Sequence, residues 1–264
     1  MRASGVRSDL AIRAASGVAM LAVALTALWL GGFAFWLLCV VAAVVMLGEW
    51  ADLHATPPRH KRLAQYALCA PLALMAPAWL ILEIHDFFTL GLLAGAAFFV
   101  VIVTHRPALA AGVLYCGLPV FALIFLRRQS PDEVGLLLAV WAMASVWACD
   151  IGAYFAGRSI GGPKLAPAIS PNKTWAGLGG GVVAAGALGW VLMTQAGLPW
   201  PLAVASPGLA VLAQAGDLYE SALKRRAGVK DSGSLLPGHG GVLDRLDGLV
   251  PVALVAAALM LLVR

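Results

Sequence analysis

The chain has 264 residues, of which 61% are hydrophobic and only 12% are charged, with a formal net charge of +5. Soluble domains carry roughly 25% charged residues, so the composition excludes a water-soluble globule, and a mean hydropathy of +0.89 indicates that the solvent is a bilayer. The positive charge does not indicate a nucleic-acid partner, because basic residues of membrane proteins gather in their cytoplasmic loops.

Nine apolar segments follow one another along the chain, and each approaches the roughly 20 residues that a helix needs to cross the hydrocarbon core. They cover residues 14–30, 33–48, 63–82, 88–104, 108–126, 134–156, 175–195, 198–215 and 248–263. Only short glycine and proline breaks mark two of the boundaries, at 31–32 and 197–201, so eight and ten spans are alternatives. We predict an all-α, polytopic integral membrane protein with about nine transmembrane helices.

The distribution of basic residues predicts the orientation of the chain. With a cytoplasmic N-terminus, 15 of the 18 Lys and Arg residues lie inside, and only Arg127, Arg128 and Arg264 lie outside. This asymmetry follows the positive-inside rule and puts both long polar loops, 157–174 and 216–247, on the cytoplasmic face. The first apolar run is too long for a cleaved leader, so we expect an anchor. Short outer loops with little charge are typical of a bacterial inner membrane.

Polar residues away from the termini concentrate in three segments. The first, residues 49–62, carries both signs of charge and two prolines, and we interpret it as a cytoplasmic connector with interfacial anchors. The four cysteines all lie in apolar stretches without metal-site spacing, so we expect small buried hydrophobes.

The second polar segment, residues 149–175, begins with Asp150 at the end of a long apolar run. A carboxylate near lipid is costly unless it is paired or hydrated. Glycines at 157, 161 and 162 break the helix and allow a ligand to approach the backbone. Lys164 and Lys173 could neutralise phosphate oxygens. An ordinary basic loop between spans is the alternative interpretation.

The third polar segment, residues 216–248, concentrates charge of both signs. A helix would align Asp217, Ser221 and Lys224 on one face. The glycine-rich turn at 237–241 can direct backbone N–H groups at phosphate oxygens. A carboxylate, a hydroxyl and an ammonium on one face, beside such a turn, suit a metal–phosphate ligand better than a lipid-facing surface.

Two further carboxylates, Asp244 and Asp247, follow at i, i+3 before the last apolar run. They require a compensating cation, and Mg²⁺ prefers carboxylate oxygens together with substrate phosphates. Taken alone, His239 fits a structural or interfacial role, and the basic run 224–226 fits a surface that faces lipid headgroups. The joint occurrence of these features with the aspartates favours a functional site.

The run SALKRRAGVKDSGSLLPGHGGVLDRLD, residues 221–247, resembles the signature of the phosphatidate cytidylyltransferase family. The family pattern is Ser, Lys-Arg, Lys-Asp, Pro-x-His-Gly-Gly and Asp-Arg-x-Asp, and every anchor position is filled here. The segments DIGAYFAGRSIGG and LAPAISPNKTW also resemble the family. The resemblance covers about the last 115 residues, so we expect N-terminal membrane helices in 1–132 and a catalytic membrane region in 133–264.

The resemblance implies a nucleotidyltransferase of phospholipid biosynthesis that converts CTP and phosphatidic acid into CDP-diacylglycerol and pyrophosphate. It also implies Mg²⁺, a possible second cation such as K⁺, a membrane-lipid environment and a possible homodimer. The nucleophile is already an anion, so charge neutralisation and positioning carry the chemistry and no strong general base is required.

Spacing, charge and resemblance together assign candidate roles. Asp217 and Asp244 are the expected Mg²⁺ ligands, and Asp247 is expected to support them. The predicted catalytic residues are Asp217, Lys224, Arg225, Asp244 and Asp247. The predicted substrate-binding residues are Asp150, Lys173, Ser221, Asp231, His239, Gly240, Gly241 and Arg245. Among these, Arg245 is expected to pair with the carboxylates, and the His-Gly-Gly turn is expected to shape the phosphate site.

One departure from the family pattern is Ala176, where the family commonly has Glu. Either the missing carboxylate weakens a substrate or cation contact, or the variation is tolerated. A catalytically silent relative and a membrane transporter are the alternative functions, although the charges cluster in two cytoplasmic loops and no span carries an acidic relay. A CDP-alcohol phosphotransferase is rejected, because Asp247-Gly248 lacks the following Ala-Arg and the later aspartates of that family.

Overall fold

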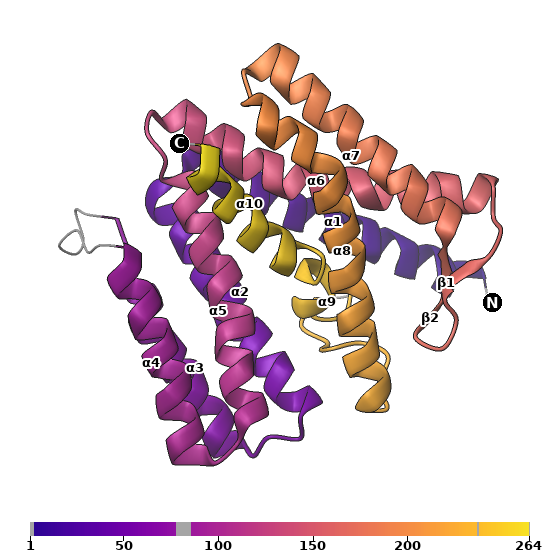
Figure 1. Ribbon diagram of the computed structural model, residues 1–264. Helices are drawn as coiled ribbons and strands as arrows, with labels where there is room; N and C mark the ends of the chain where they lie inside the picture. Colours follow the sequence, from indigo (N-terminus) through magenta and orange to yellow (C-terminus); the bar gives the residue numbers. More distant parts are fainter. Residues whose placement is uncertain (1–2, 78–85, 237, 264) are drawn as a thin grey trace. The chain divides into compact units, whose positions relative to one another are not determined.

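The computed structural model describes residues 3–77, 86–236 and 238–263, which Figure 1 draws in colour. Over these residues the chain forms ten helices and one two-stranded sheet, which confirms the predicted all-α class apart from a single hairpin. The helices are α1 (Ala3–Leu30), α2 (Gly32–Leu53), α3 (Pro58–Ala73), α4 (Asp86–Thr104), α5 (Pro107–Arg127), α6 (Asp132–Ser159), α7 (Trp175–Ala196), α8 (Trp200–Arg226), α9 (Leu243–Leu246) and α10 (Leu249–Val263). The strands are β1 (Lys164–Ala166) and β2 (Ser170–Thr174).

Each of the nine predicted apolar segments overlaps one of these helices. Within the described residues, five helices are long and apolar enough to cross a membrane, namely α2, α4, α5, α6 and α7. The apolar part of α1 and the whole of α10 are shorter, and residues 78–82 of the third predicted segment lie outside the described part of the chain. The chain is therefore an integral membrane protein, whereas the number nine and the orientation stay predictions.

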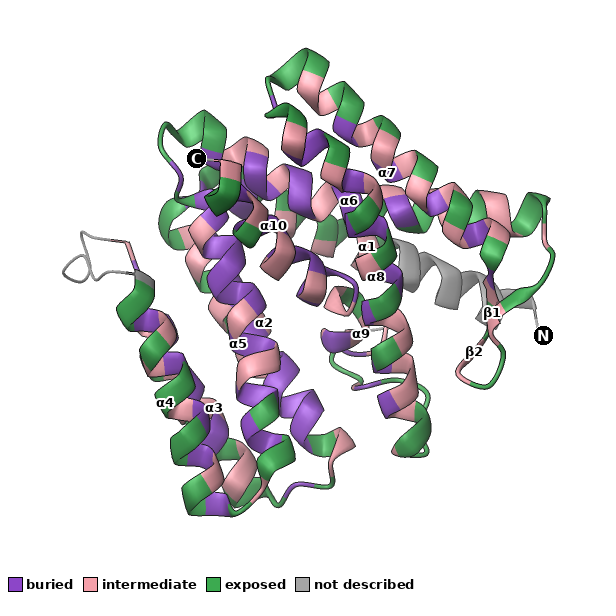
Figure 2. Cartoon of the chain, viewed as in Figure 1, coloured by how far each residue is buried: buried purple, intermediate pink, exposed green. Residues whose placement is uncertain are grey.

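The surfaces of α4 and α7 show how the chain meets its surroundings. Only 28% of the apolar window of α4 and 22% of that of α7 is buried, and Figure 2 shows green exposed positions along both helices. Helices can leave apolar side chains exposed where hydrocarbon surrounds them, because their backbone groups are satisfied internally. The exposure agrees with a lipid environment.

The chain divides into two compact units. Unit 1 contains Met1–Gly117 and Val229–Arg245, and unit 2 contains Leu118–Gly228 and Leu246–Arg264. The polar C-terminal segment therefore contributes to both units. The predicted functional division at residue 132 is a separate matter and stays a prediction.

In unit 1, α1 packs against α2, α2 against α3, and α3 against α4. The indole of Trp50 donates a hydrogen bond to the carbonyl of Ala108 at 2.8 Å and lies against the backbone of Gly112, where a side chain would clash. This contact holds the end of α2 in place. Glu49 precedes Trp50 in the same helix.

In unit 2, α7 packs against both α6 and α8, and α10 packs against the same two helices, α6 and α8. Small residues permit the closest approach: a Cβ on Gly180 would lie 2.6 Å from the carbonyl oxygen of Gly152. Such glycine contacts are typical of helix pairs within membranes. The Thr174 hydroxyl caps α7 by accepting a hydrogen bond from Gly177 N at 3.0 Å.

The expected loop 157–174 is more ordered than predicted. Helix α6 continues to Ser159, and β1 and β2 then form an antiparallel hairpin that pairs Lys164 with Thr174 and Ala166 with Ser170. The backbone N–H of Trp175 donates to the carbonyl of Pro163 at 3.1 Å, which joins the base of the hairpin to the start of α7. The hairpin therefore holds Lys173 in a defined position.

Candidate functional site

Unit 2 contains an ion pair between two predicted site residues. Lys173 Nζ, on β2, lies 2.5 Å from Asp217 Oδ2, on α8, and the two side chains are 16% and 35% exposed. The Ser221 hydroxyl donates to Asp217 Oδ1 at 3.3 Å, one helical turn further along. The structure therefore brings Lys173, Asp217 and Ser221 together in a partly buried setting.

Lys224 pairs with a carboxylate that the sequence analysis did not single out. Its ammonium lies 2.6 Å from Glu220 Oε2, and the Glu220 side chain is completely buried. The signal was present in the sequence, since a Glu four residues before a Lys on a helix favours such a pair. Because a buried carboxylate without its cation destabilises the folded protein, the Lys224 ammonium is expected to stay beside Glu220.

Asp247 shares the electrostatic environment of these groups. Burial, followed by the neighbouring Asp217 carboxylate, raises the pKa of Asp247 to about 7. A hydrogen bond from Gly248 N at 2.7 Å and the ammonium groups of Lys224 and Lys173 act in the opposite direction. We call Lys173, Asp217, Lys224 and Asp247 the charge cluster of unit 2.

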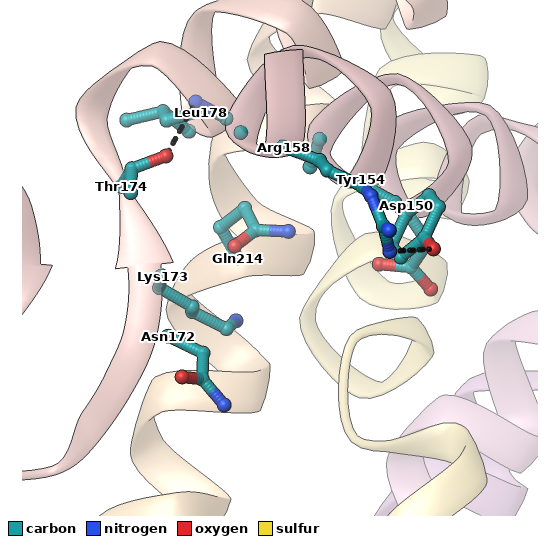
Figure 3. Close-up of a pocket in the computed structure, with 11 residues that line it drawn as sticks. Asp150, Tyr154, Arg158, Asn172, Lys173, Thr174, Leu178 and Gln214 are labelled. Carbon is teal, nitrogen blue, oxygen red and sulfur yellow. Dashed lines mark hydrogen bonds between the residues drawn. The ribbon is translucent and has the colours of Figure 1, made fainter. Parts of the chain in front are cut away.

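A cavity of about 590 Å³ opens beside the cluster, and Figure 3 shows the side chains around it. Lys173 belongs to both the cluster and the cavity wall, and Asp150 lines the cavity from α6. The Arg158 guanidinium donates to the Tyr154 hydroxyl at 3.1 Å on the same wall. The remaining lining residues are Ala153, Gly157, Asn172, Thr174, Gly177, Leu178 and Gln214. The wall of this ligand-sized space thus combines two cationic side chains, Arg158 and Lys173, with polar and apolar ones.

Arg225 lies at the exposed end of α8. Its Nε donates a long, weak hydrogen bond of 3.5 Å to the carbonyl of Ile169 in the hairpin turn. The predicted phosphate contact of Arg225 stays a prediction. Ala176, in the first turn of α7, is half-buried and does not line the cavity.

In unit 1, the described residues of 229–245 form turns that lead into α9, and we call this segment the signature loop. Asp244 Oδ2 accepts hydrogen bonds from Ser232 N at 2.9 Å and Gly241 N at 2.8 Å, so it joins two parts of the loop. Arg245 donates from Nε at 2.9 Å and from a terminal nitrogen at 2.6 Å to the carbonyl of His239. In the structure Arg245 therefore supports the turn, where we had expected it to pair with the carboxylates.

The His-Gly-Gly turn is shaped by backbone conformation. Gly240 has φ of +81°, and a Cβ there would lie 2.7 Å from Asp244 Oδ2, so only glycine fits without strain. His239 Nδ1 and the Ser16 hydroxyl are 2.9 Å apart, which links the turn to α1. Asp231, near the start of the signature loop, is exposed, and Pro237 of the predicted motif lies outside the described residues.

The sequence analysis missed one contributor to this loop. Glu49, interpreted as the start of a connector, belongs to α2 and is only 7% exposed. Its carboxylate accepts hydrogen bonds from Val242 N at 2.9 Å, Leu243 N at 2.7 Å and the Ser232 hydroxyl at 3.1 Å. The available signal was a carboxylate at the end of an apolar run, which requires a partner.

The predicted metal ligands fall in different units. Among residues 3–77, 86–236 and 238–263, no three His, Cys, Asp or Glu side chains converge as a metal site. Asp217 and Asp247 are neighbouring carboxylates of unit 2, and carboxylate oxygens are the protein ligands that Mg²⁺ prefers beside phosphates and water. A cation shared by Asp217 and Asp244 stays a prediction.

Comparison with known proteins decides the family. The model of the cytidylyltransferase family matches residues 11–263. The chain belongs to the cytidylyltransferase family. The match begins in α1, so the family likeness includes the first half of the chain and is not confined to the last 115 residues.

Three relatives of this chain are each named phosphatidate cytidylyltransferase. A phosphatidate cytidylyltransferase of Brucella suis is 41% identical over 254 residues, which cover 93% of this chain and 91% of the relative. The enzyme of the same name from Pseudomonas aeruginosa is 36% identical over 252 residues, covering 88% of this chain and 91% of that protein. The one from Bacillus subtilis is 48% identical over 126 residues, 47% of each chain.

Proposed function

We propose that this chain is a phosphatidate cytidylyltransferase, a nucleotidyltransferase that makes CDP-diacylglycerol and pyrophosphate from CTP and phosphatidic acid in phospholipid biosynthesis. The observation that carries the proposal is 41% identity to a relative of that name over 93% of the chain. The charge cluster and the signature loop supply the kinds of group that two polyanionic substrates require.

In the proposed reaction, a phosphate oxygen of phosphatidic acid attacks the α-phosphorus of CTP. The bond between the α-phosphorus and the bridging oxygen breaks, and pyrophosphate leaves with that electron pair. Lys173 and Lys224 neutralise phosphate oxygens, which reduces the repulsion between the two anions. The attacking oxygen is already ionised, so the site needs positioning and charge rather than a general base.

The cofactor of the proposal is Mg²⁺, with Asp217 and Asp244 as its ligands and Asp247 in support. Bound Mg²⁺ neutralises phosphate charge and stabilises the leaving pyrophosphate. A second cation such as K⁺ is part of the proposal. Asp217 also forms an ion pair with the Lys173 side chain and thereby orients its ammonium group.

The proposed setting is a bacterial inner membrane with the site on the cytoplasmic face. This follows from the excess of Lys and Arg in the predicted inner loops and from the bacterial sources of the relatives. A homodimer is also proposed, on the family resemblance alone.

The test is turnover by purified detergent-solubilised protein, with pyrophosphate and CDP-diacylglycerol measured together. The proposal predicts equal amounts of both products, a requirement for both CTP and phosphatidic acid, and complete loss of turnover with EDTA. A folded sample that forms neither product, with several divalent and monovalent cations supplied, would show a catalytically silent relative. Uptake of phosphatidic acid or CTP into vesicles without product would favour a transporter.

A further inference from the structure

The signature loop is held by a carboxylate that lies 183 residues or more away in the sequence. Glu49 lies near the C-terminal end of α2, and its side chain is buried within unit 1. A buried carboxylate is costly unless every oxygen finds donors. The donors that Glu49 finds all come from the signature loop.

The hydrogen bonds of Glu49 connect the first part of the signature loop with its last part. Oε1 accepts from Val242 N at 2.9 Å, and Oε2 accepts from Leu243 N at 2.7 Å and from the Ser232 hydroxyl at 3.1 Å. Both oxygens are therefore used, and they join the start of the loop to the residues that follow the glycine turn. An ionised carboxylate only accepts hydrogen bonds, so it matches three donors with no competing group.

The loop is shaped around this carboxylate. A Cβ on Gly233 would lie 2.6 Å from Glu49 Oε1, and a Cβ on Gly241 would lie 2.5 Å from Oε2. Both distances are shorter than real Cβ atoms show, so the two glycines leave the space that the carboxylate fills. Gly241 is also part of the predicted phosphate turn, and its N–H is held by Asp244 at 2.8 Å.

We propose that Glu49 is a positioning residue for CTP: it fixes the signature loop so that the turn at Gly240 and Gly241 is preorganised for the nucleotide phosphates. The inference rests on the proposed function, because the ligand of the turn is CTP only if the chain is a cytidylyltransferase. Glu49 itself contacts no substrate and acts through the backbone of the loop. Preorganisation of a binding loop strengthens binding by removing the ordering cost from the binding step.

The test variant is Glu49→Gln, which keeps the shape and replaces one acceptor oxygen by an amide donor. In either amide orientation, at least one backbone N–H, of Val242 or Leu243, loses its acceptor. Loss of a buried hydrogen bond of this kind predicts a KM for CTP raised ~10-fold. The KM for phosphatidic acid should stay within about twofold, since the loop's proposed ligand is the nucleotide.

Matched variants separate positioning from general damage. Glu133→Gln changes the same residue type at an exposed position at the start of α6 and should leave both KM values unchanged. Ser232→Ala removes only the longest of the three bonds and should raise the KM for CTP by ~3-fold. Because both changes act on one anchor, the double variant should show less than the product of the two single effects.

Hydrogen exchange by mass spectrometry tests the anchor without any assay of activity. In Glu49→Gln, amides of residues 232–243 should exchange faster, while peptides from α7 should match the unmodified protein. Failure of the unmodified protein to turn over CTP would refute the proposed function. Faster exchange in Glu49→Gln would still show that Glu49 anchors the loop. A loop that stays protected in Glu49→Gln with an unchanged KM for CTP, or a loss of kcat alone together with a lower Tm, would overturn the positioning role.

Discussion

Lys173 and Asp217 are separated by 44 residues in the chain and meet as a partly buried ion pair. The Asp217 carboxylate orients the Lys173 ammonium. The negative charge of Asp217 raises the pKa of Asp247, and the positive charge of Lys173 acts against that rise. Because the pair is partly buried and Lys173 also lines the cavity, a change of either residue should affect the site.

Asp217→Asn should reduce kcat by roughly 100-fold or more, because it removes a preorganised charge from the site and leaves the Lys173 ammonium without its carboxylate. The measurement is CDP-diacylglycerol formation by purified variant with saturating CTP and Mg²⁺. Asp52→Asn is the matched control, since Asp52 is also ion-paired, with Lys61, but that pair is more exposed. Comparable activity in the two variants would contradict the role of the cluster.

Ala176→Glu should change kcat/KM by less than about threefold, because Ala176 does not line the cavity. The new carboxylate would lie in the first turn of α7, where it interacts favourably with the helix dipole, so the Tm should not fall. Steady-state kinetics with both substrates check the first expectation and thermal unfolding in detergent checks the second. A large gain in activity would mean that the missing carboxylate belongs to the site.

The sequence predicted residues better than it predicted their partners. Spacing on one helix face led to Asp217 and Ser221, and the basic segment 149–175 led to Lys173, and the structure brings the three together. Glu49 could not be placed, because its hydrogen bond to Leu243 joins residues 194 positions apart and no local pattern encodes that contact. For Arg245 the sequence contains no sign of its contact with the His239 carbonyl, because that contact depends on how the glycine turn folds.

At the scale of elements, Gly216 allows a close approach between helices α8 and α10. A Cβ on Gly216 would lie against the carbonyl oxygen of Asp247 and 3.0 Å from ring atoms of Pro251. This close approach sets Asp247 beside Asp217, the residue that follows Gly216. The apolar runs predicted where the helices lie but not all of their ends, since α8 continues to Arg226, well beyond the predicted end at residue 215. The β1–β2 hairpin was not predicted, because its three- and five-residue strands are too short for a periodic pattern.

Gly216→Ala should displace α10 from α8, lower kcat by about tenfold and destabilise the fold by roughly 1–3 kcal/mol through overpacking. Gly208→Ala tests the same change on the same helix, where a Cβ would meet nothing within 4 Å. That control should retain full activity and equal or higher stability, as Ala favours helix more than Gly does. Kinetics and thermal unfolding of the two variants side by side decide the matter, and equal behaviour would refute the packing argument.

At the scale of the whole molecule, the signature run 221–247 is divided between the two compact units, with 229–245 in unit 1 and both 221–228 and 246–247 in unit 2. The five long apolar helices establish a membrane protein. The side of the membrane was argued only from the excess of basic residues in the predicted inner loops. It can be tested directly on exposed loop positions.

Ser234→Cys and Ser130→Cys, both at exposed positions, should label from opposite sides of the membrane. An impermeant maleimide should reach the cysteine at 234 only in inverted vesicles and the one at 130 only in right-side-out vesicles. The background is Cys69→Ser, because Cys39, Cys116 and Cys149 are buried whereas Cys69 is partly exposed. Labelling of both from the same side would contradict the predicted topology.

The most direct test of the central claim follows the phosphates of CTP. Purified protein is incubated with phosphatidic acid, Mg²⁺ and CTP labelled with ³²P at either the α- or the γ-position, and the lipid is then extracted. Attack at the α-phosphorus predicts label in the lipid only from α-labelled CTP, with γ-label recovered in aqueous pyrophosphate. Transfer of γ-label into lipid, or no lipid label from either nucleotide, would contradict the account.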